Sequence, residues 1–202
     1  LGKFSGLPQI RGIRIATKTL SFYPIRFLDE ELLSILSDCN KKKKHISVIA
    51  QISHPAEFSA KMIEAVEKIQ KTGASIRSQP VLTHGINDDV KVLTALFQKA
   101  YDCKIVPYYL VHFMPVRGVE QYALPIDEAY KIVAQLSAEL SGLEKKSIFI
   151  TAHDYGKFEI CGFCPSVDQP EEIILKWHQI VNEMYLPKAF VEKVSIEPGS
   201  LL

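Results

Sequence analysis

The sequence predicts an α/β fold in which about five strand–helix units build part of a parallel, TIM-like βα barrel. Short runs rich in isoleucine and valine alternate with longer segments of helical period, as in parallel strands joined by crossover helices. The runs are almost continuously apolar, which is typical of strands covered on both faces. The strand, loop and helix unit recurs about every 30 to 40 residues, and an open doubly wound sheet is the alternative arrangement.

Five segments are predicted as strands because each is short and rich in β-branched residues. They cover residues 12–18, 45–53, 74–82, 104–113 and 146–153. In parallel βα folds, the carboxyl ends of the strands lie on one side of the sheet and carry the working side chains. The residues that end these strands are therefore the first place to look for a site.

The segments between and after these strands are predicted as helices, because their apolar residues recur at intervals of three and four. They cover residues 29–40, 59–73, 88–103, 126–142 and 170–185. Asp29 and Ser59 are the expected N-caps, and Pro170 suits the first turn of the last helix. The chain is accordingly predicted as one domain, residues 1–202, in which residues 166–202 form a C-terminal helical extension.

The composition is that of an ordinary globular chain without a strong charge. Of 202 residues, 24 are basic and 23 acidic, so the formal net charge is +1 and neither nucleic acid nor a membrane is expected as a partner. No apolar run approaches the roughly 20 residues that span a bilayer, and the first residues lack the features of a signal peptide. A cytoplasmic location is expected.

The four cysteines give no disulfide framework in a chain of this size. Cys161 and Cys164 have the spacing of a zinc or redox pair. A second pair of ligands is missing from the sequence around them, so no metal ligand is assigned.

Polar side chains follow all five predicted strands. In chain order, the strands end at Thr17 and Lys18, at Ser53 and His54, at Gln79, at His112, and at His153 with Lys157 beyond it. If the strands curve into a barrel, these groups converge on one polar pocket.

Several of these residues also have a purely structural interpretation. His54, which precedes a proline, suits the cap of a neighbouring helix, and Gln79 suits a bond to the next strand. Residues 85–89 suit a turn followed by a helix N-cap. Lys157 suits a solvated loop.

Six motifs occur in an order that resembles the lysine 2,3-aminomutase family of radical S-adenosylmethionine enzymes. They are IRIATK with Pro24 and Arg26 following, SHPAE at 53–57, SQPVLTHGINDD at 78–89, PYYL at 107–110, LSG at 140–142 and GK at 156–157. The resemblance implies a partial βα barrel, in agreement with the periodicity. It also implies an isomerase that moves an amino group on an amino acid.

The resemblance assigns roles to four side chains. Lys157 corresponds to the lysine that forms the Schiff base with pyridoxal phosphate, and a dry pocket would favour the neutral amine that this bond needs. His54 and Gln79 correspond to contacts with S-adenosylmethionine, and Tyr108 lies where the family lines the cofactor pocket. In the family, a reduced iron–sulfur cluster cleaves S-adenosylmethionine to a radical, and pyridoxal phosphate carries the migrating nitrogen. All three cofactors are expected, with the cluster ligands outside this chain.

The sequence departs from the family's pattern at the cluster and at the substrate. The motif C-x-x-x-C-x-x-C is absent, which suggests the C-terminal portion of a longer protein. Met114 and Thr151 stand where lysine-specific members carry aspartates, so an ammonium there would lack a partner at a cost of several kcal/mol. Free lysine is therefore a poor substrate. Val111 replaces the usual third tyrosine, and residues 153–156 read HDYG in place of a four-glycine loop.

The leading hypothesis is a radical aminomutase-like isomerase that acts on another small-molecule amino acid or on a lysine of a protein. It expects His54, Gln79 and Lys157 to open into one cavity. The alternative is a divergent, non-catalytic barrel segment that serves as a binding or interaction module, and an unrelated pyridoxal phosphate-dependent barrel is a third option. The sequence leaves the oligomeric state open, and a homo-oligomer is compatible with it.

Overall fold

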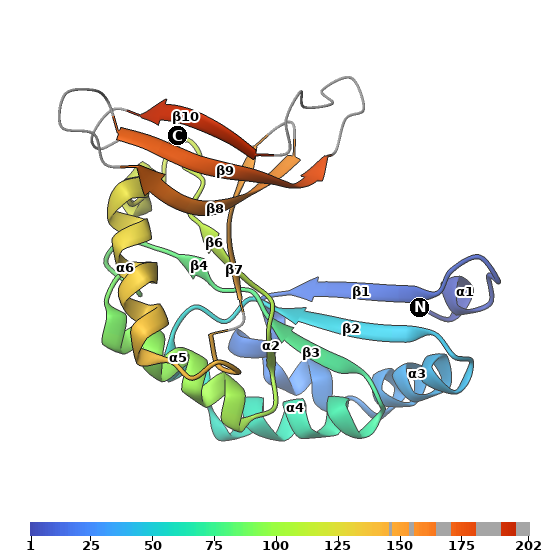
Figure 1. Ribbon diagram of the computed structural model, residues 1–202. Helices are drawn as coiled ribbons and strands as arrows, with labels where there is room; N and C mark the ends of the chain where they lie inside the picture. The colour runs from blue at the N-terminus through green and yellow to red at the C-terminus, as the bar shows by residue number, and fades with distance from the viewer. Residues whose placement is uncertain (146, 154–155, 165–170, 181–190, 197–202) are drawn as a thin grey trace. The chain divides into compact units, whose positions relative to one another are not determined.

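The computed structural model describes residues 1–145, 147–153, 156–164, 171–180 and 191–196 (Figure 1). The chain divides into two compact units. The first unit comprises residues 1–80 and 95–108, and the second comprises residues 81–94 and 109–202. Each unit has its own sheet and is described by itself.

The first unit is built on a four-stranded parallel sheet. Its strands are β1 (Gly12–Thr17), β2 (His45–Ala50), β3 (Ser75–Ser78) and β5 (Val106–Pro107), in the order β1-β2-β3-β5. Neighbouring strands are in register from Gly12 opposite His45 to Thr17 opposite Ala50, and Ala50 is in turn opposite Ser78. The carboxyl ends of β1, β2 and β3 therefore lie side by side.

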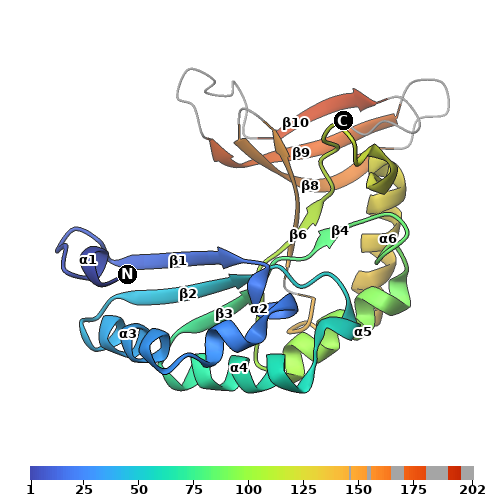
Figure 2. The same cartoon turned by 180° about the vertical axis from the view of Figure 1, so that it is seen from behind.

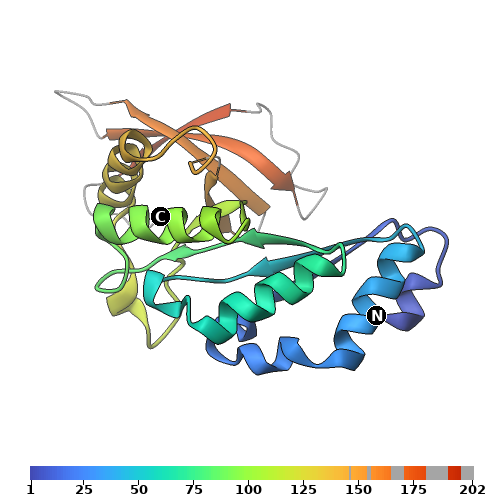
Figure 3. The same ribbon diagram turned by 90° about the horizontal axis from the view of Figure 1, so that it is seen from below.

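Helices α3 (Glu30–Lys41) and α4 (Ala60–Lys71) lie along one face of this sheet (Figures 1 and 3). The predicted caps are confirmed, because Asp29 accepts the N–H of Leu32 at 2.8 Å and Ser59 accepts the N–H of Met62 at 3.2 Å. The core of the unit is apolar and fully buried, with Leu36, Val48, Ile69 and Ile76 among its members. The short helices of the unit are α1 (Gly2–Ser5), α2 (Thr19–Phe22), η1 (Pro24–Leu28) and η2 (Pro55–Glu57).

The second unit is built on a six-stranded mixed sheet in the order β10-β9-β8-β7-β6-β4. The strands β4 (Val81–Leu82), β6 (Tyr109–His112) and β7 (Ile148–His153) are parallel. They are followed by the antiparallel strands β8 (Gly156–Cys164), β9 (Glu171–Ile180) and β10 (Val191–Ile196) (Figure 2). The helical segments of this unit include η3 (Glu120–Tyr122) and α6 (Ile126–Glu139), while α5 (Val90–Asp102) runs through residues of both units.

The predicted helix at residues 170–185 was wrong, because Glu171–Ile180 form strand β9. Burial along this segment alternates with a period of two: Ile173, Leu175 and Trp177 are buried, and the residues between them are partly exposed. That alternation, with antiparallel partners on both sides, favours a strand over a helix. The described residues of the predicted helical extension, 166–202, form two strands and no helix.

The mixed α/β class and the parallel strands are confirmed, and four of the five predicted helices have helical counterparts within a few residues. The closure of the strands into one partial barrel stays a prediction. In the described part of the chain, no helix has the length and apolar character needed to cross a membrane.

Candidate functional site

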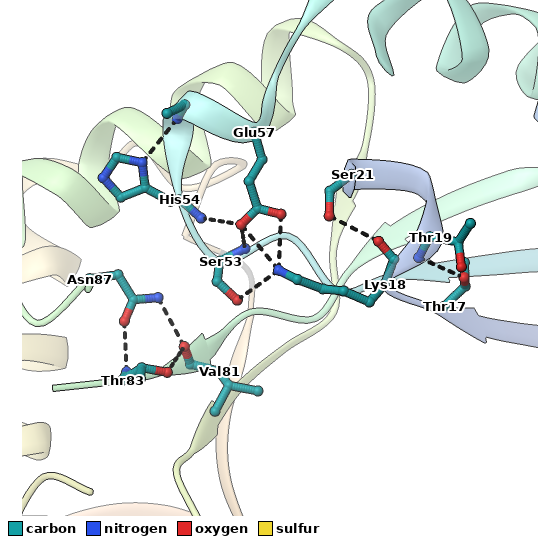
Figure 4. A network of polar contacts seen from close by, with 11 residues as sticks. Thr17, Lys18, Thr19, Ser21, Ser53, His54, Glu57, Val81, Thr83 and Asn87 are labelled. Carbon is teal, nitrogen blue, oxygen red and sulfur yellow. Dashed lines mark hydrogen bonds and ion pairs between the residues drawn. The ribbon is translucent and has the colours of Figure 1, made fainter. Parts of the chain in front are cut away.

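The loop after β2, residues 53–57, folds back on itself around one carboxylate. Glu57 Oε1 accepts the backbone N–H of Ser53 at 2.8 Å and that of His54 at 3.0 Å (Figure 4). With the imidazole of His54 capping the same turn, these bonds form a capping box at the start of η2. The motif SHPAE therefore builds a self-supporting turn at the carboxyl end of β2.

The same carboxylate ties this loop to the end of β1. The Lys18 ammonium lies 2.9 and 3.1 Å from the two oxygens of Glu57 and 3.4 Å from the hydroxyl of Ser53 (Figure 4). Burial acts to raise the pKa of Glu57, but contacts with Ser21, Lys18 and the Ser53 backbone outweigh it and hold the pKa below its ordinary value. Glu57 is therefore ionised at neutral pH.

His54 keeps one ring nitrogen engaged in this turn. Its Nδ1 accepts the backbone N–H of Ala56 at 3.1 Å, so the proton of the neutral ring is on Nε2. The capping interpretation of His54 is thus confirmed for Nδ1. The imidazole is half-buried, and the Nε2–H group is the donor it can offer to a ligand.

Gln79 follows β3 and lies next to the end of β2 in the sheet. Its backbone N–H donates to the carbonyl of Ala50 at 2.9 Å, and the residue is half-buried. His54 and Gln79 therefore come from the carboxyl ends of two hydrogen-bonded neighbouring strands, as the sequence predicted.

Residues 85–89 form the turn and helix cap that the structural interpretation expected. Asp89 accepts the N–H groups of Lys91 and Val92 at the start of α5. The fully buried Asn87 accepts the N–H of Thr83 at 2.7 Å and donates to the carbonyl of Val81 at 2.9 Å (Figure 4). The buried side chain of Asn87 therefore stabilises the turn through hydrogen bonds to its backbone.

Tyr108 is in contact with two arginines that sequence reasoning did not single out. Arg14 donates to the Tyr108 hydroxyl at 3.1 Å, and the guanidinium carbon of Arg77 lies 5.6 Å from the centroid of the Tyr108 ring. Both arginines come from strands of the same sheet. Arg14 lies within IRIATK and Arg77 directly precedes SQPVL, but neither motif indicates that the two side chains share a face of the sheet.

Lys157 lies in the second unit, one residue into β8. Its ammonium is 5.3 Å from the centroid of the Tyr109 ring, and the Tyr109 hydroxyl is 2.5 Å from Nε2 of His178. Gly156, which precedes Lys157, has φ of 152°, a backbone conformation that residues with a side chain rarely adopt. Sequence reasoning missed His178, because its segment was assigned to a helix.

Lys157 is half-buried and takes part in no ion pair with a residue that the structure describes. The pairing of Ala152 with Lys157 and of Thr151 with Phe158 places Thr151 on the opposite face of the sheet from Lys157. Met114 is exposed. Asp154 and Tyr155, in the segment that replaces the glycine loop, lie outside the described residues.

The cysteine pair is described only in part. Cys161 is an exposed residue, but its thiol is partly shielded from water. This desolvation, together with the nearby Glu159 carboxylate, raises the pKa of the thiol. The side chain of Cys164 lies outside the described residues. Within the described residues, no group of three or more histidine, cysteine or acidic side chains is arranged to hold a metal ion.

The residues predicted for the site thus fall in both units. His54, Gln79 and Tyr108 belong to the first unit, and Lys157 belongs to the second. A single cavity shared by His54, Gln79 and Lys157 stays a prediction. The described residues provide two hydrogen-bonding side chains, His54 and Gln79, at the ends of strands in one sheet, and an amine, Lys157, without a described ion-pair partner in the other.

Comparison with known proteins gives several similar sequences, whereas no model of a protein family matches the chain. A protein of Aquifex aeolicus (strain VF5) named "Putative L-lysine 2,3-aminomutase" is 32% identical over 178 residues, which are 87% of this chain and 46% of that protein. The glutamate 2,3-aminomutase of Clostridioides difficile (strain 630) is 28% identical over 154 residues, 75% of this chain and 35% of that enzyme. The L-lysine 2,3-aminomutase of Buchnera aphidicola subsp. Baizongia pistaciae (strain Bp) is 31% identical over 138 residues, 68% of this chain and 39% of that enzyme.

The chain spans less than half the length of each of these three relatives. The similarity nevertheless extends over most of the chain itself and agrees with the six motifs. The chain belongs to the lysine 2,3-aminomutase family of radical S-adenosylmethionine enzymes.

Proposed function

We propose that this chain is part of an isomerase that moves an amino group on an amino acid with the help of pyridoxal phosphate and S-adenosylmethionine. The names of the relatives support an aminomutase, since they include lysine and glutamate 2,3-aminomutases. The observation that carries the proposal is the position of Lys157: a half-buried amine after a glycine, above an aromatic ring and without a described carboxylate partner.

Lys157 is the residue that would hold pyridoxal phosphate, which when bound would carry the migrating nitrogen of the substrate. The surroundings fit this role. An amine in a salt bridge would have to break that bond before reacting, whereas the contact described for the Lys157 ammonium is with the ring of Tyr109. Tyr109 offers a flat apolar surface beside the amine, and His178 fixes the Tyr109 hydroxyl.

His54 and Gln79 are the residues that would contact S-adenosylmethionine. Both side chains donate and accept hydrogen bonds without adding a charge, which suits the ribose and adenine edges of a ligand that already carries charges. The Nδ1 bond of His54 to Ala56 fixes which ring nitrogen can donate.

The substrate would be an amino acid other than free lysine. Met114 and Thr151 carry no carboxylate, so neither can pair with a second ammonium of the substrate. Met114 is exposed, and Thr151 is buried on the face of β7 opposite Lys157. A small-molecule amino acid with a different side chain, or a lysine within a protein, fits this description. We also propose that the protein assembles as a homo-oligomer.

Reductive trapping of the cofactor tests the proposal. The full-length protein is incubated with pyridoxal phosphate and borohydride, digested, and the modified lysines are identified by mass spectrometry. Modification is expected at Lys157 in the wild type and is expected to be absent from Lys157→Arg, which keeps the charge but cannot form the bond.

Lys176→Arg is the matched control. Lys176 lies on the neighbouring strand in an ion pair with Glu159 at 2.9 Å, and its arginine variant is expected to retain modification at Lys157. Trapping at other lysines with Lys157 untouched would overturn the assignment. A folded protein with no trapped lysine would favour the non-catalytic binding module.

A further inference from the structure

One face of the four-stranded sheet carries cations and no acidic residue. Arg14 is opposite Ser47, and Arg77 is opposite Ile49 two residues further along β2, so both arginines point to the same face. The buried Val48 and Ile76 lie on the other face, which α3 and α4 cover. The strands β1, β2, β3 and β5 contain no aspartate or glutamate.

Both guanidinium groups are held on one tyrosine. Arg14 donates to the Tyr108 hydroxyl at 3.1 Å, while Arg77 lies over the Tyr108 ring at 5.6 Å. Tyr108 is itself fixed, because its backbone N–H donates to the carbonyl of Ser78 at 3.1 Å. Their contacts with Tyr108 therefore hold both guanidinium groups beside the same side chain.

Neither arginine takes part in an ion pair with a residue that the structure describes. Exposed arginines commonly need no partner. Two that share an aromatic anchor on a face whose strands carry no acidic residue are different, because an anion bound there would reduce the repulsion between them.

We propose that Arg14 and Arg77, positioned by Tyr108, form a binding site for a small oxyanion, a carboxylate or a phosphate group. The planar fork of a guanidinium matches both groups with two parallel N–H donors, and a second guanidinium doubles the charge that attracts them. An amino acid supplies a carboxylate and a phosphorylated cofactor supplies a phosphate. This site does not depend on the role proposed for Lys157.

Protection from arginine modification tests the site directly. The full-length protein is labelled with phenylglyoxal, and the rate at each arginine is followed by peptide mass spectrometry with inorganic phosphate or glutarate as the probe. At a probe concentration ten times its dissociation constant, labelling of Arg14 and Arg77 is expected to slow about tenfold. Protection by phosphate alone would identify a phosphate site, and protection by glutarate alone would identify a carboxylate site.

Arg11 and Arg26, which are exposed, are the internal controls, and their labelling rates are expected to stay constant. Arg77→Leu is expected to weaken the protection of Arg14 at least tenfold. Tyr108→Phe, which keeps the ring and removes the hydroxyl, is expected to weaken it less. Lys157→Arg is expected to leave it unchanged. Equal protection of Arg11 and Arg14, or none at Arg14 and Arg77 with either probe, would overturn the proposal.

Discussion

The Lys18 ammonium and the Glu57 carboxylate lie 2.9 Å apart and join the end of β1 to the loop that follows β2. Because Glu57 also accepts the N–H groups of Ser53 and His54, one side chain supports both the loop and its connection to the neighbouring strand. Lys18 is more exposed than Glu57, so the ion pair itself contributes less than the backbone bonds.

Glu57→Ala is expected to lower the free energy of unfolding by about 1–3 kcal/mol, because two backbone N–H groups lose their acceptor. Urea denaturation of the full-length protein measures this loss. Glu64→Ala is the control, since the ion pair described for Glu64 is an exposed one with Lys61 within α4 and is expected to contribute about 0.2–0.5 kcal/mol. Losses of equal size in the two variants would contradict the role of Glu57.

Glu57 also predicts a dependence of stability on pH. Its pKa in the folded protein lies below the ordinary value of 4.5, since the hydrogen bonds outweigh burial. The unfolded chain therefore binds a proton more readily, so this stabilisation is present above about pH 4.5 and is lost as the pH falls through the folded pKa. Denaturation at a series of pH values is expected to show a steeper acid loss in the wild type than in Glu57→Gln. Parallel curves would contradict the prediction.

The hydrogen bond between Tyr109 and His178 predicts coupling between β6 and β9. Tyr109→Phe is expected to cost about 1 kcal/mol of unfolding free energy, because it removes the hydroxyl that lies 2.5 Å from Nε2 of His178. In a double-mutant cycle with His178→Phe, the two losses are expected to be less than additive. Tyr101→Phe, on the exposed side of α5, is the control and is expected to change little.

Trapping of pyridoxal phosphate distinguishes the contribution of the Tyr109 ring from that of the Tyr109 hydroxyl. Tyr109→Phe retains the ring beneath Lys157 and is expected to preserve trapping, whereas Tyr109→Leu removes the ring and is expected to reduce it. Equal trapping in both variants would show that the ring has no part in presenting the amine.

The buried amide of Asn87 predicts a large loss on truncation. Asn87→Ala leaves the buried N–H of Thr83 without its acceptor, and it leaves the carbonyl of Val81 with the Thr83 hydroxyl as its one remaining side-chain donor among the described residues, at an expected cost of about 2 kcal/mol. Thermal and urea denaturation measure the effect. The control is Asn40→Ala, because Asn40 is exposed and makes a longer bond of 3.3 Å to Thr72, and a similar loss there would argue against the distinction.

Much of the fold follows from local patterns that need no knowledge of distant contacts. The apolar runs at 12–18 and 45–53 became β1 and β2, and the caps at Asp29 and Ser59 formed as their positions implied. The segment 170–185 failed because a proline followed by two acidic residues imitates a helix start. The alternating burial of Ile173, Leu175 and Trp177 indicates a strand, and the pairing of this strand with β8 and β10 could not be read from the local sequence.

The candidate site was predictable where it lies at strand ends and unpredictable where it depends on register. His54 and Gln79 could be named because each directly follows an apolar run. Glu57 carried a readable signal, since it stands three residues after His54 in the spacing of a capping box. The common face of Arg14 and Arg77 carried none, because it depends on how β1 and β3 align with β2.

The turn at residues 53–57 has a thermodynamic consequence. Its backbone donors are already satisfied by Glu57 and its imidazole is already oriented by Ala56, so a molecule arriving at His54 meets a rigid surface. Association there sacrifices little conformational entropy of the protein. The binding entropy measured by calorimetry for such a complex would accordingly contain little contribution from the ordering of this loop.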